Sequence, residues 1–467
     1  MIQKFTKNVA TIGPATETEE TLKQLIEAGM NVARFNTKHS SPEWHQERIK
    51  RVRKVAKEMG QAVAVLLDLQ GPEIRINLPG ETPFELEADE TCIFTHDENF
   101  KADKKVLIPI NVVKALQVGN MVLLDDGFCE LEVAEVNKDH LVLKALGKCT
   151  VKHRKTMNIP GITIDMPSLV DADYEQLDGA GKEDNVDFVG LSFVRNRADI
   201  IFLRKELEKR NIRAQIIAKI ETQAALDNLE EIVSESEAVM IARGDLGVEV
   251  PYEELVFWQR EIINLCRLQG KPVIVATQML SSMVSQPRPT RAEVSDVAHA
   301  IYDNTDAVML SEETTIGDYP VKAVKTQASI ASFNEDFADN TLVLLPSSNN
   351  TEILTKAAID ILETSEQDIS AIICLTGTGH TARLLSRFRP HAPVIAVTNS
   401  EDTYYTLALA YGVNPELMLG DDEIDMVKAL AHLKKKGVIQ KDEKVLLVHG
   451  MNLNQNMTSV ISLINVE

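Results

Sequence analysis

The chain has 467 residues and a formal net charge of −21, from 49 Lys and Arg against 70 Asp and Glu, and this length is typical of about three domains. The acidic balance argues against nucleic acid as the main partner, because phosphate backbones recruit basic surfaces. Uninterrupted apolar runs fall far short of the ~18 residues that a spanning helix needs, and the N-terminus lacks a signal-peptide core, so we expect a cytoplasmic protein without a membrane anchor.

Short runs rich in β-branched residues recur along the chain, and each is followed by an amphipathic stretch. Eight of these runs are candidate strands, beginning at Asn8, Asn31, Ala62, Asp187, Gln215, Ala238, Pro272 and Ala307. Near-continuous apolar strands that alternate with helices indicate a parallel sheet covered on both faces. Eight such units predict an α/β fold of the (β/α)8 barrel type.

Three helix starts carry capping signals. Thr16 with Glu19 and Thr290 with Glu293 fit capping boxes, and Ser41 precedes Pro42 in the way that an N-cap precedes a first-turn proline.

The step from the third candidate strand at Ala62 to the fourth at Asp187 spans 125 residues, which is too long for one βα unit. Its segments alternate in polarity and carry turn signals, which predicts an inserted small antiparallel β domain, a small β-barrel. After about residue 337, five further strand candidates alternate with helical segments and predict a separate open α/β domain. The predicted domains are therefore 1–70 and 159–338 for the barrel, 71–158 for the insertion, and 339–467 for the C-terminal domain.

The five cysteines form no CxxC pair and their number is odd. Free thiols in a reducing compartment are the expectation for such a chain.

Polar side chains gather where the candidate barrel strands end, and catalytic groups of such barrels come from those ends. They are Arg34, Asn36, Asp68, Ser192, Lys219, Glu221, Asp245, Thr277, Ser311 and Glu313. Side chains at i and i+2 share a face of a strand, so Lys219 and Glu221 point the same way. The pair is either an ion pair internal to the barrel or part of a catalytic site.

Glu221 plus Asp245 is a sparse set of oxygen ligands that suits Mg²⁺ or Mn²⁺. Lys219 could then stabilise charge on an enolate or on a transferring phosphoryl group. Residues 242–247 (ARGDLG) are either a strand-to-helix turn with an Asp cap or a site where backbone N–H groups bind a carboxylate or phosphate. Thr277 is either a satisfied strand hydroxyl or a contact to substrate or to a relayed proton.

Residues 377–382 (GTGHTA) follow a candidate strand and open a helix. They match a dinucleotide-binding turn only weakly. A loop that holds a phosphate with Thr376, Thr378, Thr381 and backbone amides is the better interpretation. The chain has no Walker motif and no protein-kinase signature set, so any phosphoryl transfer must use another scaffold.

The segments ATIGPA, EAGMNVARFN, GPEIR, AKIE, ARGDLGVEVP, ATQML and PRPTRAEVSDVA, in this order, resemble those of the pyruvate kinase family along almost the whole chain. The resemblance implies a barrel, an inserted β domain that acts as a mobile lid, a C-terminal effector domain and a homotetramer. It also implies transfer of phosphate from phosphoenolpyruvate to ADP, giving pyruvate and ATP, late in glycolysis.

By position, the resemblance implies that Lys219 stabilises the enolate and the transferring phosphate, and that Glu221 and Asp245 bind Mg²⁺ or Mn²⁺. The amides of Gly244 and Asp245, with Thr277, would hold the substrate carboxylate. Thr277 and Ser311 would lie where protonation of the enolate is organised.

The resemblance also implies that Arg34 and Arg75 engage phosphates and that Asn36, His39 and Arg75 face the nucleotide. Asn36 and Asp68 would belong to a monovalent-cation site.

This chain departs from the family pattern at several positions. Lys38 stands where the family usually has a Ser that binds K⁺. Its ammonium could occupy the K⁺ position, in which case activity would not require added K⁺, or it could point into solvent. Gln70 and Ala172 stand where the family usually has lysines near the nucleotide. The loss of these two cations should weaken ADP binding unless another basic residue compensates. Glu312 stands where Gly is usual.

Residues 449–459 (HGMNLNQNMTS) lack the Trp and Arg of some sugar-bisphosphate-activated members, so we do not expect control by a sugar phosphate or AMP.

Two other functions fit parts of this pattern. One is another Mg²⁺-dependent enolate enzyme on a barrel, such as a pyruvate-class aldolase, although it would need neither the insertion nor ADP. The other is a paralogue with little catalysis that senses phosphorylated metabolites, which the replacements at Gln70, Ala172 and Glu312 keep open.

Overall fold

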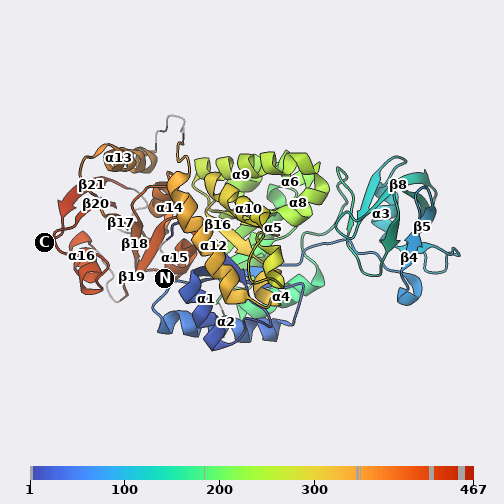
Figure 1. Cartoon of the computed structure of the whole chain (residues 1–467), viewed down its shortest axis with the longest axis horizontal. Coiled ribbons are helices and arrows are strands. Elements are labelled where there is room, and N and C mark those ends of the chain that lie inside the picture. Colours follow the sequence, from blue (N-terminus) through green and yellow to red (C-terminus); the bar gives the residue numbers. More distant parts are fainter. Residues whose placement is uncertain (1–3, 184, 343–346, 348, 420–424, 451–457) are drawn as a thin grey trace.

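The computed structural model describes residues 4–183, 185–342, 347, 349–419, 425–450 and 458–467. The molecule is elongated, with the barrel in the middle, the inserted β domain at one end and the C-terminal domain at the other (Figure 1). Among the helices of these described ranges, none is long and apolar enough to cross a membrane.

Eight parallel strands close the barrel, hydrogen-bonded in the order β1-β16-β15-β14-β13-β12-β3-β2. Their bounds are β1 (Lys7–Thr11), β2 (Met30–Asn36), β3 (Ala64–Asp68), β12 (Phe188–Leu191), β13 (Gln215–Ile220), β14 (Ala238–Ala242), β15 (Val273–Ala276) and β16 (Ala307–Leu310). All eight candidate strands became barrel strands, so the predicted (β/α)8 architecture is confirmed.

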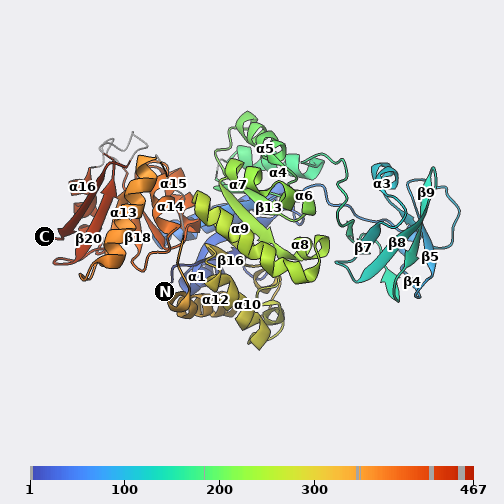
Figure 2. The same ribbon diagram turned by 90° about the horizontal axis from the view of Figure 1, so that it is seen from above.

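Helices surround the barrel on its outer face (Figures 1 and 2). They are α1 (Glu19–Ala28), α2 (Pro42–Glu58), α4 (Asp171–Gly181), α5 (Arg197–Lys209), α6 (Gln223–Asp227), α7 (Leu229–Glu235), α8 (Arg243–Glu249), α9 (Leu255–Gln269), α10 (Arg291–Tyr302), α11 (Glu312–Thr315) and α12 (Pro320–Asn334).

Two of the three predicted helix caps are confirmed. The hydroxyl of Ser41 caps α2, and Thr290 with Glu293 forms a capping box on α10. The cap predicted at Thr16 is wrong, because α1 is capped by Thr18, whose hydroxyl accepts from the amide of Thr21. Thr16 is fully buried and donates to the carbonyl of Thr314 at 2.8 Å, so its hydroxyl fixes a loop beside the barrel instead.

The inserted domain is a mixed, half-barrel sheet with the strand order β11-β7-β8-β9-β5-β6, beside a two-stranded sheet β10-β4. Its strands pair antiparallel as predicted except for β5 with β6, so it is two sheets rather than one closed small barrel. The elements are β4 (Phe84–Leu86), β5 (Thr91–Thr95), β6 (Lys105–Leu107), α3 (Ile110–Ala115), β7 (Met121–Leu124), β8 (Cys129–Val136), β9 (His140–Ala145), β10 (Cys149–Val151) and β11 (Met157–Asn158).

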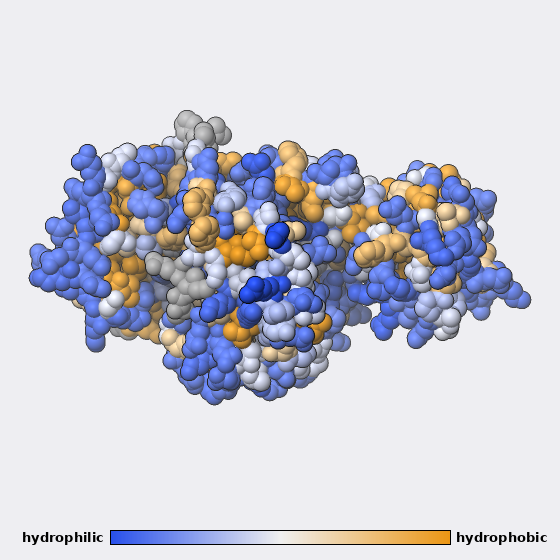
Figure 3. Space-filling model, viewed as in Figure 1, coloured by the Kyte–Doolittle hydropathy of each residue, from blue (hydrophilic) through white to orange (hydrophobic). Residues whose placement is uncertain are grey.

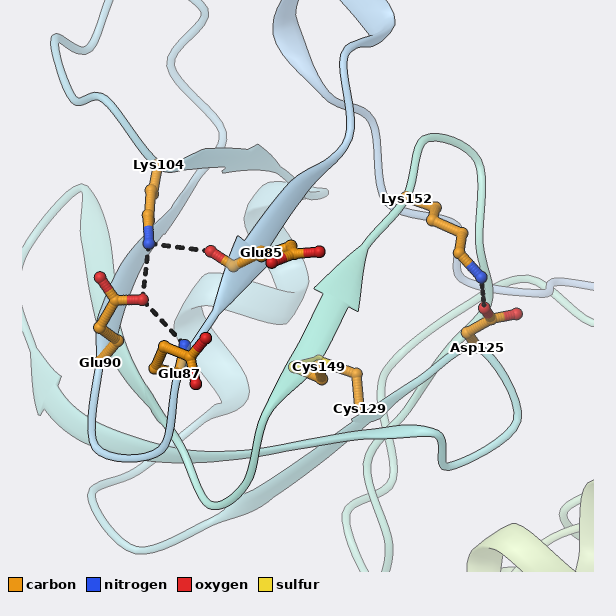
Figure 4. Close-up of a disulfide and its surroundings, with 8 residues drawn as sticks. All are labelled: Glu85, Glu87, Glu90, Lys104, Asp125, Cys129, Cys149 and Lys152. Carbon is orange, nitrogen blue, oxygen red and sulfur yellow. Dashed lines mark hydrogen bonds and ion pairs between the residues drawn. A yellow bond between two sulfur atoms is a disulfide. The ribbon is translucent and has the colours of Figure 1, made fainter.

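A disulfide between Cys129 and Cys149 joins the two sheets of this domain (Figure 4). Each cysteine opens its strand, and the packing of β10 on β8 brings their Cα atoms to 5.2 Å, within bridging range. The expectation of free thiols is therefore wrong for this pair, because the approach depends on sheet packing across 20 residues of sequence. Cys92, Cys266 and Cys374 are free and buried.

The C-terminal domain is the predicted open α/β sheet, in the order β19-β18-β17-β20-β21 with β21 antiparallel. The strands are β17 (Ala371–Leu375), β18 (Val394–Thr398), β19 (Val413–Leu417), β20 (Lys444–His449) and β21 (Val460–Asn465), and the helices are α13 (Asn350–Thr364), α14 (His380–Ser386), α15 (Glu401–Thr406) and α16 (Met426–Lys435). Apolar residues of α13 and α14 cover one face of the sheet and those of α16 the other.

A short 3₁₀ helix of the C-terminal domain, Leu407–Leu409, closes the lower end of the barrel. Ala408 and Leu409 belong to the same buried apolar cluster as the inward-facing barrel residues, such as Val9 and Val32. The ammonium of Lys7, at the start of β1, donates to the carbonyl of Val413 at 2.7 Å. The two domains therefore share one core, and the limits 70/71, 158/159 and 338/339 remain proposals.

Candidate active site

The ammonium of Lys219 lies at the upper end of β13, where the barrel strands end. It donates to the hydroxyl of Ser192 at 2.7 Å, and its Nζ is 2.8 Å from Glu221 Oε1 and 3.4 Å from Asp68 Oδ1. Burial lowers the pKa of Lys219, but the charges of Asp68, Glu221 and Asp245 outweigh it and raise that pKa above its ordinary value. The ammonium is therefore permanently charged and held in one position.

Arg34 supplies a second fixed cation at the same rim. Its Nε donates to Asp68 Oδ2 at 2.7 Å and its Nη1 to the hydroxyl of Thr11 at 2.9 Å. Asp68 thus lies between Arg34 and Lys219. Burial raises the pKa of this carboxyl, but the two cations overcome the effect and hold that pKa below its ordinary value.

Glu221 and Asp245 are two carboxylates at this rim, of which Glu221 is buried and Asp245 half-buried. The amide of Phe193 donates to Glu221 Oε2 at 2.7 Å. Asp245 lies in the first turn of α8, which begins directly after β14. Burial and the charge of Glu221 raise the pKa of Asp245 to about 7. Two carboxylates that repel each other in this way are a donor set that a divalent cation would stabilise, and Mg²⁺ takes only one or two carboxylates, completing its shell with water and substrate oxygens.

Thr277 and Gly244 contact each other across the ends of β14 and β15. The amide of Gly244 donates to the hydroxyl of Thr277 at 2.7 Å. The backbone of Thr277 has φ of 70° and is followed by Gln278 with φ of 55°, an arrangement that costs energy in non-glycine residues and is common at functional sites. Arg243 holds this turn, because its guanidinium donates to the Thr277 carbonyl at 2.9 Å and to both carboxylate oxygens of Asp296 at 2.7 Å.

Ser311 follows β16, and its amide donates to Glu313 Oε2 at 2.7 Å. Glu313 is 1% exposed and also accepts from the amide of Leu280 at 3.0 Å, so it ties the last two strand ends together. Glu312 is exposed on the first turn of α11.

Lys38 lies in the cleft and pairs with a carboxylate that the sequence analysis did not single out. Its Nζ is 3.0 Å from Glu73 Oε1, and its side chain is 25% exposed. Arg75 donates from Nε to Glu73 Oε2 at 2.8 Å. The amide of Lys38 donates to Asn36 Oδ1 at 3.2 Å, and the charge of Lys38 acts on Asp245. Its backbone is therefore beside Asn36, whereas its ammonium is paired with Glu73.

The other residues predicted to face the nucleotide lie on the surface around this cleft. His39 and Ala172 are exposed and Gln70 is half-buried. The amide of Gln70 donates to Asp173 Oδ1 at 2.9 Å, so the loop after β3 is held against α4.

A cavity of about 130 Å³ opens beside Asp245 and Glu73. The two chain segments that connect the barrel to the inserted domain, near Glu73 and along 156–166, form part of its wall, and Asp245 and Phe193 lie on the barrel side. The inserted domain is therefore attached at the mouth of the site.

The threonine-rich loop before α14 is far along the chain from this rim. The hydroxyl of Thr376 accepts from the amide of Gly379 at 2.9 Å, and Thr381 shares a hydrogen bond of 3.0 Å with Thr458. Thr378 accepts from Arg383 through its carbonyl at 3.2 Å. Residues 451–457 of the closing segment lie outside the described residues.

Arg243, Asp296 and Glu73 are the site residues that sequence reasoning missed. Their partners are distant in sequence or on a linker, so neither spacing nor periodicity signals them. The available hint is that each lies inside a segment quoted for the family resemblance: Glu73 in GPEIR, Arg243 in ARGDLGVEVP and Asp296 in PRPTRAEVSDVA.

Two fixed cations that face buried carboxylates suit a reaction in which anionic oxygens gain charge. Chemistry of this kind, carried at the rim of a (β/α)8 barrel with an inserted β domain, is that of a phosphotransferase. Comparison with known proteins agrees: the family model "Pyruvate kinase, barrel domain" matches residues 3–324, and "Pyruvate kinase, alpha/beta domain" matches residues 352–464. The chain therefore belongs to the pyruvate kinase family, as predicted.

Individual relatives cover nearly the whole chain. A pyruvate kinase of Bacillus licheniformis is 41% identical over 455 residues, which is 95% of this chain and 77% of the relative. One from Staphylococcus epidermidis is 40% identical over 462 residues, 97% of this chain and 79% of the relative. The crystal structure of a pyruvate kinase from Cryptosporidium parvum has a TM-score of 0.93 at 33% identity and covers 99% of this chain and 96% of its own.

Proposed function

We propose that this glycolytic phosphotransferase moves the phosphoryl group of phosphoenolpyruvate to ADP, and that Lys219 is its central catalytic residue. The observation that carries this is the position of the Lys219 ammonium, within 3.4 Å of both Asp68 and Glu221 at one rim. In the reaction, the bond between phosphorus and the enol oxygen breaks and a new bond to a terminal ADP oxygen forms. The enolate left behind takes one proton at its methylene carbon and becomes pyruvate.

Lys219 and Arg34 are suited to the charge that develops in this transfer. Both are locked by carboxylates before substrate arrives, so neither must reorganise when the bridging oxygen gains negative charge. The turn at Gly244 and Thr277 would bind the substrate carboxylate through backbone N–H groups at a helix start, with the Gly244 amide turning to the substrate from the Thr277 hydroxyl, to which it donates at 2.7 Å. Thr277 and Ser311 are then beside the enolate, where a hydroxyl can help deliver the proton.

Glu221 and Asp245 would hold the divalent cation, Mg²⁺ or Mn²⁺. Pyruvate kinases generally use Mg²⁺ and K⁺. When bound here, the divalent ion supplies positive charge to substrate oxygens. The pair of a buried Glu221 and a half-buried Asp245, with the Asp245 pKa raised to about 7, is the feature of this chain that supports such a ligand.

Lys38 would take over the role of the monovalent cation at Asn36 and Asp68, so that activity does not require added K⁺. Its support is that its amide contacts Asn36 and that its charge acts on Asp245, and the proposal requires its ammonium to leave Glu73, with which it is paired at 3.0 Å. The same ammonium, with Arg75, would offset the loss of lysines at Gln70 and Ala172 on the nucleotide side.

The remaining parts of the proposal concern assembly and control. Large apolar side chains are exposed on the barrel and just after it, with Tyr252 85%, Phe257 56% and Phe333 68% exposed, and apolar patches interrupt the hydrophilic surface over the barrel (Figure 3). Such patches mark association surfaces and support an oligomer; that the oligomer is a homotetramer in the cytoplasm is part of the proposal. The loop at Thr376, Thr378 and Thr381 would bind a phosphate group if an effector exists.

A coupled assay of pyruvate release tests this function. The purified chain is supplied with phosphoenolpyruvate, ADP and Mg²⁺, and other nucleoside diphosphates are scanned in parallel. ATP formation that depends on all three components is expected. Binding of phosphoenolpyruvate with no turnover would favour the metabolite-sensing paralogue. Release of pyruvate from a 4-hydroxy-2-oxo acid, with no turnover of phosphoenolpyruvate, would favour an aldolase-like enzyme.

A further inference from the structure

The turn that follows β15 has an unusual backbone. Thr277 has φ of 70° and Gln278 has φ of 55°, in the left-handed region that a β-branched residue such as threonine rarely adopts. A residue in this conformation costs free energy and keeps it only where the surrounding structure holds it there. Side chains around this turn must therefore supply contacts that offset the strain.

Arg243 supplies the first of these contacts. Its Nη2 donates to the Thr277 carbonyl at 2.9 Å and to Met279 Sδ at 2.8 Å. Arg243 opens α8 directly after β14, so its guanidinium reaches from the end of one barrel strand to the turn that follows the neighbouring strand. Its side chain is 10% exposed, so little water competes for these hydrogen bonds.

Asp296, on α10, fixes the guanidinium of Arg243. Its two carboxylate oxygens accept from Nη1 and Nη2 at 2.7 Å each. A bidentate pair of this kind fixes the plane of the guanidinium as well as its position. Without this carboxylate, Arg243 would be a largely buried cation whose other hydrogen-bond partners in the described part of the chain are neutral, which is costly. The two residues therefore act as one unit.

A second contact from α10 holds the chain just after the turn. Glu293, in the first turn of α10, accepts from the amide of Ser282 at 2.6 Å and from its hydroxyl at 2.5 Å. Ser282 lies in the short 3₁₀ helix Ser281–Val284. The helix α10 thus anchors the segment 277–284 near both of its ends.

These contacts decide where the Thr277 hydroxyl lies. The hydroxyl accepts from the amide of Gly244 at 2.7 Å and donates to the carbonyl of Ala276 at 2.6 Å. A return of φ to the ordinary negative range would redirect the bond from Cα to Cβ and carry the hydroxyl away from Gly244. Because Arg243 holds the carbonyl of Thr277, it also fixes the hydroxyl at the catalytic rim.

We propose that Arg243 and Asp296 are positioning residues for protonation of the enolate, and that they act through Thr277. The inference rests on the proposed function, in which the Thr277 hydroxyl helps to deliver the proton. In that step a C–H bond forms at the methylene carbon as an O–H bond breaks, and water returns a proton to the hydroxyl oxygen. Phosphoryl transfer precedes this step and depends on Lys219, so loss of the pair should slow protonation more than transfer.

Two rates measured on the full chain separate these steps. Formation of ATP from phosphoenolpyruvate and ADP reports phosphoryl transfer. Exchange of the pyruvate methyl protons with D₂O, followed by NMR with ATP and Mg²⁺ present, reports proton movement at carbon. In Arg243→Met the exchange rate should fall at least about tenfold further than ATP formation, because a well-placed proton donor contributes roughly 10²- to 10⁴-fold and its misplacement loses part of this. Asp296→Asn should shift the ratio of the two rates in the same direction.

Arg260→Met is the matched control. Arg260 lies on α9, its Nε is 3.3 Å from Asp303, and its side chain is 63% exposed, so it forms an arginine–carboxylate pair on a neighbouring helix. Both of its rates should stay within about twofold of wild type, because exposed ion pairs contribute little.

A double variant tests whether the pair acts through Thr277. Thr277→Val alone should lower the exchange rate relative to ATP formation, and the addition of Arg243→Met should lower that ratio no further. Circular dichroism must show that each variant is folded. If Arg243→Met is not folded, Asp296→Asn takes its place, since the Asp296 side chain is 36% exposed.

Three results would count against the inference. Equal falls of the two rates in Arg243→Met would overturn it and leave the proposed function intact. A further fall of the ratio in the double variant would also overturn it, because the pair would then act elsewhere than on Thr277. A wild-type chain that forms no ATP would overturn the proposed function and this inference with it.

Discussion

Replacing Lys219 by Met removes the cation on which the proposed chemistry depends. In wild type the ammonium is held by Ser192 and two carboxylates, and two unit charges 3.4 Å apart attract by about 5 kcal/mol at an effective dielectric constant of about 20. These attractions fix the ammonium before substrate binds. Its hydrogen bond to the nascent enolate therefore needs no reorganisation.

Loss of one preorganised donor of this kind costs roughly 3–4 kcal/mol of transition-state stabilisation, which corresponds to a fall in kcat of roughly 10²- to 10³-fold. Steady-state kinetics in the coupled assay measures it. Exchange of the pyruvate methyl protons with D₂O, followed by NMR, tests enolate stabilisation separately from phosphoryl transfer and should fall in parallel.

Lys38→Met is the comparison, because it removes the same charge from the same cleft without touching the enolate. With K⁺ present it should stay within about tenfold of wild type in kcat. Circular dichroism must show that Lys219→Met is folded, since Asp68 and Glu221 are left facing each other. A folded Lys219→Met enzyme whose kcat lies within tenfold of wild type would refute the reasoning.

Three further outcomes are expected. In an assay free of Na⁺ and K⁺, added K⁺ should change the rate of the wild-type enzyme little, whereas it should raise the rate of Lys38→Ser at least tenfold. Strong stimulation of the wild-type enzyme by K⁺ would contradict the role given to Lys38. Asp245 has a pKa raised to about 7 and would bind metal only when deprotonated. The affinity for Mn²⁺ in the absence of substrate should therefore rise about tenfold per pH unit up to about pH 7 and stay constant above it. Titration calorimetry that finds the same affinity from pH 5.5 to 7 would exclude this titration. In denaturant without reductant, three thiols should react rather than five, because Cys129 and Cys149 are joined. Reduction should lower the free energy of unfolding of the inserted domain by about 3 kcal/mol, as expected for a disulfide that closes a loop of 20 residues. Five reactive thiols would show that the bond is absent.

The parts of the fold that sequence predicts best are those with a strong local period. Each barrel strand is a short apolar run buried on both faces, such as 238–242 with every residue buried, and such runs stand out whatever surrounds them. The two-residue spacing of Lys219 and Glu221 likewise predicts that they share a face, and the structure brings them to 2.8 Å. The catalytic and ligand roles given to these residues stay predictions.

Residue pairs that form only through tertiary packing could not be predicted from the sequence. Lys38 with Glu73 and Cys129 with Cys149 join segments whose separation carries no period. Sequence places the cap of α1 two residues early because Thr16 is followed three residues later by Glu19, as a capping box requires, whereas Thr18 is followed by Thr21. The contact of Thr16 with the distant Thr314 takes its hydroxyl away from the helix and leaves the cap to Thr18.

Ala408 and Leu409 of the C-terminal domain cover the lower end of the barrel core, so the barrel cannot be produced without them and keep this core buried. A fragment ending near residue 338 would uncover the floor of the barrel to water and leave its inward-facing alkyl groups wet, so we expect it to aggregate rather than behave as an autonomous module. A shortened chain for the study of catalysis alone would thus need another apolar segment to cover the lower end of the barrel, for example a grafted Leu-Ala-Leu turn.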